Sequence, residues 1–403
     1  MRITGVNKTF DVDVNLVGSK SESNRALMIA YYGGFTPRVK NLSESDDTKL
    51  LNGILQSLIN PNNPINPITI DCANAGTVLR FLATALSFRD GDYILTGNVR
   101  MLQRPVGDLV DALRSMGADI QYMGQEGCPP LKIKGKNPVC PKNIHVDITR
   151  SSQFASSILL ALPVVGTRRA TSKIHLDGDL SSLPYIDMTI DIMRRFGIDV
   201  HRDGCEVILQ PSDYQDIEYT IESDWTCASY WYEIVAFSEN GRARLHNLHL
   251  DSDQGDAIVA KWFEQFGVTS IQDGNDIIIE KNHSIFFNDL SFDFINNPDL
   301  YPTIAATCAG LGVEGRFTGL RNLIHKESDR VAAMTTELAK NNKFNSHDDH
   351  RIAMALAPLA MKIGAIEINN ADVVSKSYPN FWQEVDSVIS TEAVRRSGEI
   401  STK

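Results

Sequence analysis

Apolar side chains recur every three or four positions in several stretches of the chain, and three of these stretches end alike. In Leu109–Ile120, Thr189–Val200 and Val259–Ser270 the periodic run leads to a glycine and then to residues that favour strands. The spacing predicts one apolar helix face, and the glycine suits the left-handed position that follows a helix end. Each stretch therefore predicts a helix, a tight turn and a strand.

These stretches are similar enough to be copies of one helix-turn-strand motif, with Gly117, Gly197 and Gly267 at equivalent positions. Met334–Phe344 reads as a fourth copy in which two asparagines replace the glycine, since Asn also tolerates the left-handed conformation. Such repetition predicts an α/β array built from similar units. The alternative is that any α/β protein contains helix-glycine-strand junctions, and three matches alone do not decide between the two.

Strands are predicted between the helices wherever short apolar and β-branched runs occur. They are Asp92–Thr96, Leu131–Lys134, Asp276–Glu280 and Ala365–Asn369. A chain of 403 residues is too long for one ordinary core and suits two domains of roughly 200 residues each.

Composition and charge narrow the class of protein. The apolar content of 42% and the charged content of 22% are those of a globular chain. The net charge of −11 argues against a nucleic-acid partner, and the absence of a long uncharged apolar run argues against a membrane span. No signal core opens the sequence, and six cysteines without a C-x-x-C pair read as reduced thiols rather than a disulfide frame or a zinc site. We therefore expect a cytoplasmic protein, in which local clusters of cations mark a small anionic ligand.

One such cluster lies at the start of a predicted helix near the N-terminus. Gly18–Arg25 reads G-S-K-S-E-S-N-R and precedes the apolar run Ala26–Tyr31. Backbone N–H groups, the helix dipole and side-chain charge can converge there on an anion. The spacing is not that of a nucleotide P-loop. A plain Ser or Asn cap with solvated charges is the alternative.

Further helix starts in the first half of the chain carry ligand-type groups. They are Asn74–Arg80 (N-A-G-T-V-L-R), Arg104-Pro105, Ser151–Phe154 (S-S-Q-F) and Ser182–Tyr185 (S-L-P-Y). In the first of these, Gly76 would let the backbone approach a ligand closely. One such start is an ordinary cap, but capping alone does not explain the whole series.

The C-terminal third gathers charged side chains in the same way. Asn297-Pro298-Asp299 precedes the apolar run Leu300–Leu311, Lys326–Arg330 reads K-E-S-D-R, Asp348–Arg351 reads D-D-H-R before Ile352–Ala360, and Lys376–Pro379 follows a strand predicted over Val373–Ser375. A charge run is usually a solvated face. Helix starts and strand ends, however, are where α/β proteins place ligands.

Together these strings resemble the enolpyruvyl transferases that make 5-enolpyruvylshikimate 3-phosphate. The segments that carry the resemblance occur in family order from Gly18 to Pro379: G-S-K-S-x-S-N-R, N-A-G-T-x-x-R, R-P, S-S-Q-F, P-Y-I-D, P-D, K-E-S-D-R, D-H-R-x-A-M and K-S-Y-P. They span nearly the entire chain, and K-E-S-D-R with D-H-R-I-A-M is the most specific combination.

The resemblance implies an α/β fold of two similar domains, each a pseudo-threefold array of βαβαββ units with helices packed inside sheets. It implies one domain from residues 19–221 and a second, discontinuous domain from residues 1–18 and 222–403. Substrates would bind in the cleft between the domains, which would close on binding. The resemblance implies a monomer with no cofactor, and no cluster with metal-ligand spacing calls for a metal.

The resemblance also implies two ligand sets. Shikimate 3-phosphate would contact Lys20, Ser21, Arg25, Ser151, Ser152, Gln153, Ser182, Asp299, Asn322 and Lys326. Phosphoenolpyruvate would contact Lys20, Asn74, Gly76, Arg104, Gln153, Arg330, His350, Arg351 and Lys376. Each ligand carries a phosphate and a carboxylate, so their burial needs several cations.

The implied chemistry is an addition followed by an elimination. The 5-hydroxyl attacks C2 of phosphoenolpyruvate while C3 gains a proton, and phosphate then leaves. This path needs a base and an acid. The resemblance points to Asp299 as the base and Glu327 as the acid, with Lys20 sharing the proton transfers.

Two positions depart from the family pattern. Phe81 follows Arg80 where many relatives carry Pro, and Asp224–Trp231 reads D-W-T-C-A-S-Y-W where the family has smaller residues. The second departure puts in doubt a role for this segment near the shikimate ring.

Gly76, which bears no methyl group, predicts sensitivity to glyphosate, the inhibitor that competes with phosphoenolpyruvate in this family.

Three other functions compete with this one. The sister transferase that acts on UDP-N-acetylglucosamine is expected to carry a reactive cysteine shortly before an R-P pair, and Gly97–Gln103 contains none. A catalytically silent paralogue would have lost a reacting group, yet Lys20, Asp299, Glu327 and Arg351 are all present. A structural repeat protein would not explain why charges gather at helix starts.

Overall fold

The computed structural model describes residues 1–4, 7–59, 67–136, 142–165, 171–282 and 290–389. The chain forms two compact units. Unit 1 comprises Met1–Ser19, Ser43–Asp46 and Glu222–Lys403, and unit 2 comprises Lys20–Leu42 and Asp47–Ile221. The short segment Ser43–Asp46 thus packs with unit 1, although it lies within the range expected for the first domain.

Unit 2 contains two copies of the same βαβαββ order. The first copy consists of β4 (Ile68–Asp71), α3 (Gly76–Ser87), β5 (Gly91–Thr96), α4 (Gly107–Ser115), β6 (Asp119–Tyr122) and β7 (Leu131–Gly135). The second consists of β8 (Asn143–Asp147), α5 (Gln153–Ala161), β9 (Ser172–Asp177), α6 (Leu183–Arg195), β10 (Val200–Asp203) and β11 (Glu206–Leu209). The sheet orders are β4-β5-β7-β6 and β8-β9-β11-β10. In each, the first pair is parallel and the later pairs are antiparallel.

The rest of unit 2 is a shorter α/β segment. It consists of α1 (Lys20–Gly33), β3 (Arg38–Lys40), α2 (Asp46–Ile59) and β12 (Glu218–Thr220). The strands β3 and β12 pair in parallel and form the third sheet described in this unit.

Unit 1 repeats the four-stranded arrangement once. It uses β2 (Thr9–Val14), α7 (Trp225–Phe237), β13 (Asn240–Leu245), α8 (Val259–Glu264), β14 (Val268–Asp273) and β15 (Asp276–Lys281) in the order β2-β13-β15-β14. The other elements are β16 (Ser291–Asp293), α9 (Tyr301–Leu311), β17 (Arg316–Thr318), α10 (Arg330–Leu338), β18 (Lys343–Asn345), α11 (His350–Leu356), α12 (Ala360–Ile363), β19 (Ile366–Asn369), α13 (Phe381–Ile389) and β1 (Arg2–Ile3). They add the sheets β16-β17 and β1-β19-β18.

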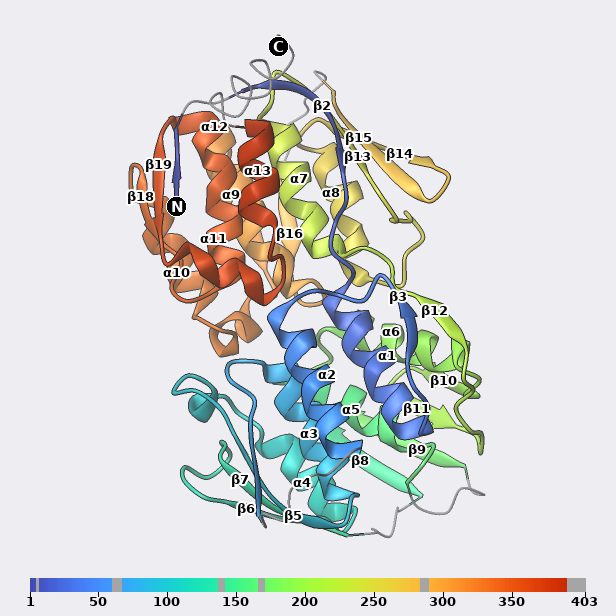
Figure 1. Ribbon diagram of the computed structural model, residues 1–403. Helices are drawn as coiled ribbons and strands as arrows, with labels where there is room; N and C mark the ends of the chain where they lie inside the picture. The colour runs from blue at the N-terminus through green and yellow to red at the C-terminus, as the bar shows by residue number, and fades with distance from the viewer. Residues whose placement is uncertain (5–6, 60–66, 137–141, 166–170, 283–289, 390–403) are drawn as a thin grey trace, which may run out of the picture. The chain divides into compact units, whose positions relative to one another are not determined.

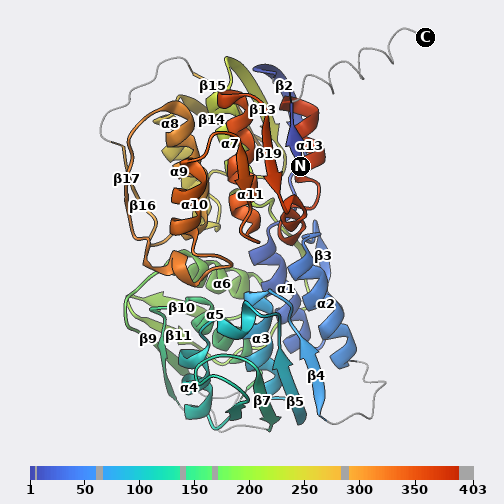
Figure 2. The same cartoon turned by 90° about the vertical axis from the view of Figure 1, so that its left-hand side faces the viewer.

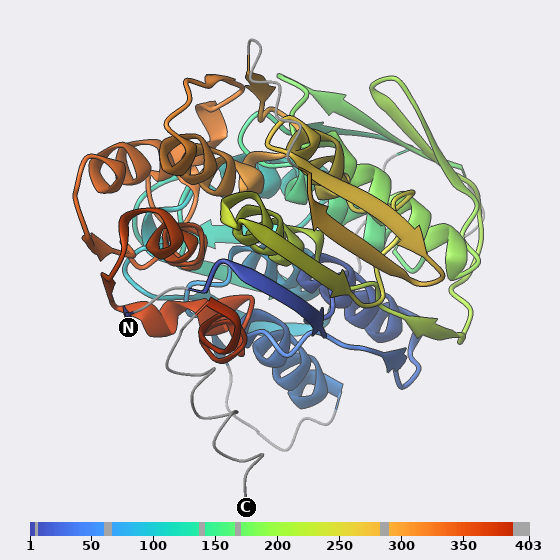
Figure 3. The ribbon, with the colours of Figure 1, turned by 90° about the horizontal axis from the view of Figure 1, so that it is seen from above.

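Helices occupy the interior of each unit and strands lie outside them (Figure 1). In Figure 2, β16 and β17 run along the outside of α9 and α10. Seen from above, the helices of unit 1 appear nearly end-on with strands around them (Figure 3). Helix α7 is buried along its full length, which explains why its sequence is apolar on every side. The buried apolar residues form two clusters, one in each unit.

The three predicted helix-turn-strand motifs are confirmed. Gly117, Gly197 and Gly267 have φ angles of 89°, 89° and 75°, and each stands between a helix and a strand. The fourth motif, Met334–Phe344, also runs from a helix, α10, into a strand, β18. Its asparagines, Asn341 and Asn342, are not among the described residues with positive φ, so the glycine-like turn expected there was wrong.

Two further expectations about local structure were wrong. The segment Val373–Ser375 is not a strand but part of the 3-10 helix η6 (Ala371–Lys376), with Ala371 and Val374 buried three positions apart. Helix α1 begins at Lys20, so Lys20–Arg25 lies inside its first turns instead of preceding it.

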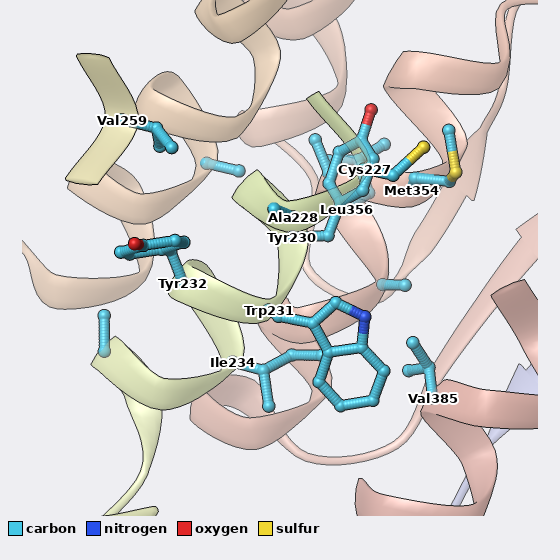
Figure 4. Packing of buried hydrophobic residues seen from close by; sticks show 14 of the residues in the cluster. Cys227, Ala228, Tyr230, Trp231, Tyr232, Ile234, Val259, Met354, Leu356 and Val385 are labelled. Atoms are coloured by element: carbon cyan, nitrogen blue, oxygen red, sulfur yellow. The ribbon is translucent and has the colours of Figure 1, made fainter. Parts of the chain in front are cut away.

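The bulky segment Asp224–Trp231 belongs to the core of unit 1. Asp224 caps α7, and its carboxylate accepts a hydrogen bond from the Cys227 N–H at 3.0 Å. Figure 4 shows Tyr230, Trp231 and Tyr232 pointing in different directions from α7 into its surroundings. The indole N–H of Trp231 donates to the Tyr378 hydroxyl at 3.2 Å. The large side chains therefore fill the core.

Two segments that flank unit 2 in the sequence pair with each other inside unit 1. The Ser19 N–H donates to the Glu222 carbonyl at 2.8 Å, and the Asp224 N–H donates to the Val17 carbonyl at 2.9 Å. Gly18 and Ser223 form an antiparallel bridge between these two bonds.

Within the described part of the chain, no helix has the length and apolarity needed to cross a membrane.

Candidate functional site

The carboxylate of Asp299 lies among three cationic side chains of unit 1. Asp299 belongs to the 3-10 helix η3 (Pro298–Leu300), directly before α9. Its Oδ1 accepts a hydrogen bond from Arg330 Nη1 at 2.7 Å and lies 3.4 Å from Lys326 Nζ. Its Oδ2 accepts from Arg351 Nη2 at 2.8 Å. The sequence-predicted residues Asp299, Lys326, Arg330 and Arg351 are thus brought together.

Arg330 connects this carboxylate to two others. It is the first residue of α10, and its side chain is only 1% exposed. Besides Asp299, its guanidinium donates to Glu327 Oε2 at 3.0 Å and to Asp349 Oδ2 at 2.8 Å. A planar fork of N–H donors suits such a position between several carboxylates. Arg330 therefore holds the K-E-S-D-R segment against the start of α11.

Asp349 also positions the cations of α11. It caps this helix, and its side chain accepts from the Arg351 backbone N–H at 3.0 Å. The Ser328 hydroxyl donates to the same carboxylate at 3.1 Å. His350 is buried beside it, with Nδ1 3.7 Å from Asp349 Oδ1.

Lys376 and Asn322 complete the predicted residues of unit 1. Lys376, at the end of η6, places Nζ 3.7 Å from Glu327 Oε1. Asn322 is buried in the 3-10 helix η4 (Arg321–His325), which leads into Lys326. Glu327 therefore lies between Arg330 and Lys376.

Burial and charge act in opposite directions on the ionisable groups of this cluster. Burial raises the pKa of Asp299, but the charges of Arg351, Lys326 and Arg330 outweigh it and hold the pKa well below the usual range. Burial lowers the pKa of Lys326, against the attraction of Asp299. Burial also disfavours the charged form of Arg330, yet Asp349, Asp299 and Glu327 raise its pKa. Asp299 is thus anionic when no ligand is bound.

Unit 2 holds a second cluster, built around Arg25 on α1. Its Nε donates to the Thr189 hydroxyl of α6 at 2.7 Å, and Nη2 donates to the Tyr185 carbonyl at 3.0 Å and to the Ser156 hydroxyl of α5 at 3.3 Å. Nη1 donates to the carbonyl of Ser21 at 2.9 Å. Burial is the main cause that lowers the pKa of Arg25 to about 10, so the group remains cationic at neutral pH.

The amide of Gln153 is fixed at the start of α5. Its Oε1 accepts from Arg80 Nη1 at 2.6 Å, and its Nε2 donates to the Thr77 hydroxyl at 2.9 Å. Both partners belong to α3 and come from the N-A-G-T-V-L-R string. Ser152 precedes α5 as its N-cap residue, and the Ser151 hydroxyl accepts from the Gln153 N–H at 3.3 Å.

Gly76 and Arg104 are in close contact in unit 2. Gly76 begins α3, and Arg104 follows the 3-10 helix η1 (Met101–Gln103). A Cβ atom added at Gly76 would lie 2.7 Å from Arg104 Nη1 and 2.8 Å from its Cζ. Arg104 Nη1 also donates to the Asn74 carbonyl at 3.4 Å. A side chain at this position would therefore require the guanidinium to shift.

The other predicted residues of unit 2 lie at helix starts. Lys20 begins α1, and its Nζ is 3.5 Å from Asp47 Oδ2. Ser182 precedes α6 in the left-handed conformation, with φ of 55°. A non-glycine residue in that region is uncommon and often marks a functional turn.

Several residues of these clusters were missed by sequence reasoning. They are Asp47, Thr77, Ser156, Thr189 and Asp349. Asp349 stands within D-D-H-R, so its place before a helix was a usable capping signal. Arg80 was noticed only as part of a string. The partners on α5 and α6 are set by packing between distant segments, and no local pattern marks them.

The two clusters can bind anions and transfer protons. Each combines buried or half-buried cations with hydroxyl, amide or carboxylate groups, as polyanionic ligands require. In the part of the chain that the structure describes, no group of three or more His, Cys, Asp and Glu side chains could hold a metal ion.

Comparisons with known proteins identify the family. A sequence model described as EPSP synthase (3-phosphoshikimate 1-carboxyvinyltransferase) matches residues 6–343 and 339–385. The 3-phosphoshikimate 1-carboxyvinyltransferase of Bacteroides fragilis (strain YCH46) is 37% identical, covering 92% of this chain and 94% of that protein. The protein of the same name from Vibrio campbellii is 33% identical, covering 93% of this chain and 96% of that protein.

Solved structures show the same fold. The EPSP synthase of Acinetobacter baumannii superposes with a TM-score of 0.74 at 22% identity, covering 97% of this chain and 98% of that one. The enolpyruvyl transferase NikO from Streptomyces tendae superposes with a TM-score of 0.68 at 14% identity and covers 96% of both chains. The predicted α/β fold of two similar domains is thereby confirmed. By sequence and fold, the chain belongs to the EPSP synthase (3-phosphoshikimate 1-carboxyvinyltransferase) family.

Proposed function

We propose that this chain transfers the enolpyruvyl group of phosphoenolpyruvate to the 5-hydroxyl of shikimate 3-phosphate and releases phosphate. This is the reaction of the shikimate pathway that leads to chorismate and the aromatic amino acids. Family membership supports it. The observation that carries it is the half-buried carboxylate of Asp299, held by Arg330, Arg351 and Lys326. This arrangement of one carboxylate and three cations supports the assignment of a base beside phosphate-binding groups.

The proposal assigns ligand roles to both clusters. Shikimate 3-phosphate is bound by Lys20, Ser21, Arg25, Ser151, Ser152, Gln153, Ser182, Asp299, Asn322 and Lys326. Phosphoenolpyruvate is bound by Lys20, Asn74, Gly76, Arg104, Gln153, Arg330, His350, Arg351 and Lys376. The fixed geometry of Arg25 and Gln153 supports these roles, because their partners hold each group in place before a ligand arrives.

Asp299 is a weak base while its cationic partners surround it, since its pKa is well below the usual range. An anionic ligand that binds Arg330 and Arg351 competes with Asp299 for the same N–H donors. The carboxylate then loses part of its stabilisation, so its pKa rises toward the range useful for accepting a hydroxyl proton. Binding of phosphoenolpyruvate would thereby activate the base.

Glu327 is assigned as the acid that protonates C3 of phosphoenolpyruvate, with Lys20 sharing the proton transfers. Glu327 is close to both Arg330 and Lys376, two proposed contacts of that ligand. The protein would act as a cytoplasmic monomer without a cofactor or metal. A catalytically silent paralogue is the remaining alternative, because binding groups alone do not establish turnover.

Phosphate release tests the proposed function. Purified protein is incubated with phosphoenolpyruvate and shikimate 3-phosphate, and each substrate is omitted in turn. Release should require both substrates, and Asp299→Asn or Lys20→Met should lower turnover by about a hundred- to ten-thousand-fold. Asp372→Asn, which changes an exposed carboxylate of unit 1, serves as the matched control and should keep wild-type turnover. Binding of both ligands by calorimetry without any release would favour the silent paralogue.

A further inference from the structure

A buried carboxylate without an assigned role, that of Asp256, interacts electrostatically with Asp299. Asp256 belongs to the 3-10 helix η2 (Gly255–Ile258) and is 5% exposed. Its Oδ2 accepts a hydrogen bond from the Thr226 hydroxyl at 2.6 Å, and its Oδ1 accepts from Asn297 Nδ2 at 3.2 Å. Asp256 lies outside the sequence motifs that resemble the family, and the proposed proton transfers give it no role.

The two hydrogen bonds tie Asp256 to the segment that carries the base. Thr226 lies in the first turn of α7, which is buried throughout. Asn297 precedes Pro298 and Asp299, so its side chain anchors the start of η3. Asp256 thus links α7 to the Asn297–Asp299 segment through one carboxylate. The charged groups that face it are Asp299 from η3 and Arg351 from α11, while α7 contributes the Thr226 hydroxyl.

We propose that Asp256 is a positioning residue that holds the Asn297–Asp299 segment through Asn297 and strengthens Asp299 as a base through its negative charge. This inference rests on the proposed function and deepens it. A negative charge near a carboxylate favours protonation of that carboxylate, so it makes Asp299 a better proton acceptor. The same charge faces Arg351 and therefore weakens the hold of that arginine on an added anion.

Asp256 changes its charge within the working pH range of most enzymes. Burial, followed by the charge of Asp299, raises its pKa to about 6, against the opposing effects of Thr226, Arg351 and Asn297. Above that pH the carboxylate is ionised and supports Asp299, and below it the group is neutral and the support is lost. A neutral replacement should therefore resemble the wild type in acid and differ from it in base.

The ratio of variant to wild-type turnover, measured against pH at saturating substrates, tests the proposal. Ionisations of the substrates cancel in this ratio. For Asp256→Asn it should be close to one at low pH and fall to roughly one third to one tenth above pH ~7. Glu233→Gln, which alters another buried carboxyl group of unit 1, is the matched control and should give a ratio near one throughout.

Thr226→Val supplies a second test that keeps the carboxylate. Loss of the hydroxyl donor removes a hydrogen bond to the ionised form, so the pKa of Asp256 should rise. The turnover ratio should then dip only in a window just above the pKa of about 6 and recover at higher pH, as expected when the titration of Asp256 moves upward. Thermal unfolding of each variant shows whether it is folded at the assay temperature.

Binding of phosphoenolpyruvate gives a readout that does not depend on turnover. Asp256→Asn should tighten binding about two- to fivefold at alkaline pH, because it removes a negative charge facing Arg351, and should leave binding unchanged in acid. A turnover ratio that does not vary with pH, or binding that weakens equally at all pH values, would show that Asp256 is merely structural. Absence of phosphate release by the wild type would instead reject the proposed function, and the binding measurement would still decide the role of Asp256.

Discussion

At the scale of single residues, the contact between Gly76 and Arg104 depends on the missing side chain. Arg104 is buried, and its guanidinium occupies the space that a Cβ atom at residue 76 would need. The methyl group and the guanidinium cannot both fit without a shift of the arginine. Binding of any ligand that contacts Arg104 should therefore weaken when this glycine is replaced.

Gly76→Ala should raise the KM for phosphoenolpyruvate about tenfold, which corresponds to ~1.4 kcal/mol, and leave the KM for shikimate 3-phosphate within about twofold. Steady-state kinetics with each substrate varied in turn measures the split. The same variant should be less sensitive than the wild type to glyphosate, to which the wild type is expected to be sensitive. Gly53→Ala, on α2 with no atom within 4 Å of the added Cβ, is the control. Equal changes in both KM values would contradict the predicted role of Arg104.

Glu233 illustrates a different residue-scale effect, on stability. Its side chain is fully buried in α7, and neither carboxyl oxygen has a hydrogen-bond partner among the described residues. Burial raises its pKa well above the usual range, so the folded protein keeps this group protonated at neutral pH. In the unfolded chain the group ionises at its ordinary pKa. Its contribution to stability is therefore full below that ordinary pKa and is lost as the pH rises toward the folded value.

Glu233→Gln should be more stable than the wild type, by a margin that grows with pH. The expected slope is about 1.4 kcal/mol per pH unit above pH ~4.5, up to the raised pKa of the folded state. Urea unfolding at several pH values measures it. Glu239→Gln removes an exposed carboxylate just beyond α7 and should give a difference that hardly changes with pH. A constant offset for Glu233→Gln would mean that the group is ionised in the folded state.

At the scale of elements, Asp349 joins α10 to α11. Its carboxylate is fully buried, caps α11 and binds the Arg330 guanidinium at the start of α10. Its removal would leave a buried arginine with one carboxylate fewer and a helix without its cap. The start of α10 has a comparison residue in Asp329, which caps that helix at 3.1 Å from the Ala332 N–H but is exposed.

Asp349→Ala should lower the free energy of unfolding by about 3–5 kcal/mol, because it breaks a buried ion pair as well as a cap. Asp329→Ala should cost only about 1 kcal/mol, the usual value of a cap. Denaturant unfolding of both variants compares the two helices directly. Similar losses in the two variants would show that the Arg330 contact adds little.

Local patterns predicted the helix-turn-strand repeats, and contacts between distant segments were the main omission. The helix-turn-strand motifs that contain Gly117, Gly197 and Gly267 were predictable because helix periodicity and a glycine turn are both local signals. The strand expected at Val373–Ser375 failed because two β-branched residues suggested it, whereas burial at a spacing of three residues folds the segment as η6. The bonds from Asp256 to Thr226 and Asn297 join separate parts of the chain, so no local pattern could reveal them.

At the scale of the whole molecule, the same topology is used repeatedly. Three four-stranded sheets share one order, with one parallel pair followed by antiparallel pairs, and they occur in both units. Each unit surrounds its own cluster of buried apolar residues. The polar helix starts at Gly76, Gln153 and Ser182 belong to these repeats, whereas Lys20, Asp299 and Arg330 belong to the shorter segments of the two units.

The pairing of Val17–Ser19 with Glu222–Asp224 has a consequence for how such a chain could arise. The two backbone bonds and the bridge bring together the residues on either side of unit 2, within unit 1. The outer ends of unit 2 therefore leave unit 1 side by side, as the ends of a module inserted into a loop of a host domain would, although Ser43–Asp46 returns to unit 1 between them. Gene duplication followed by insertion at this point would produce the present order of the chain.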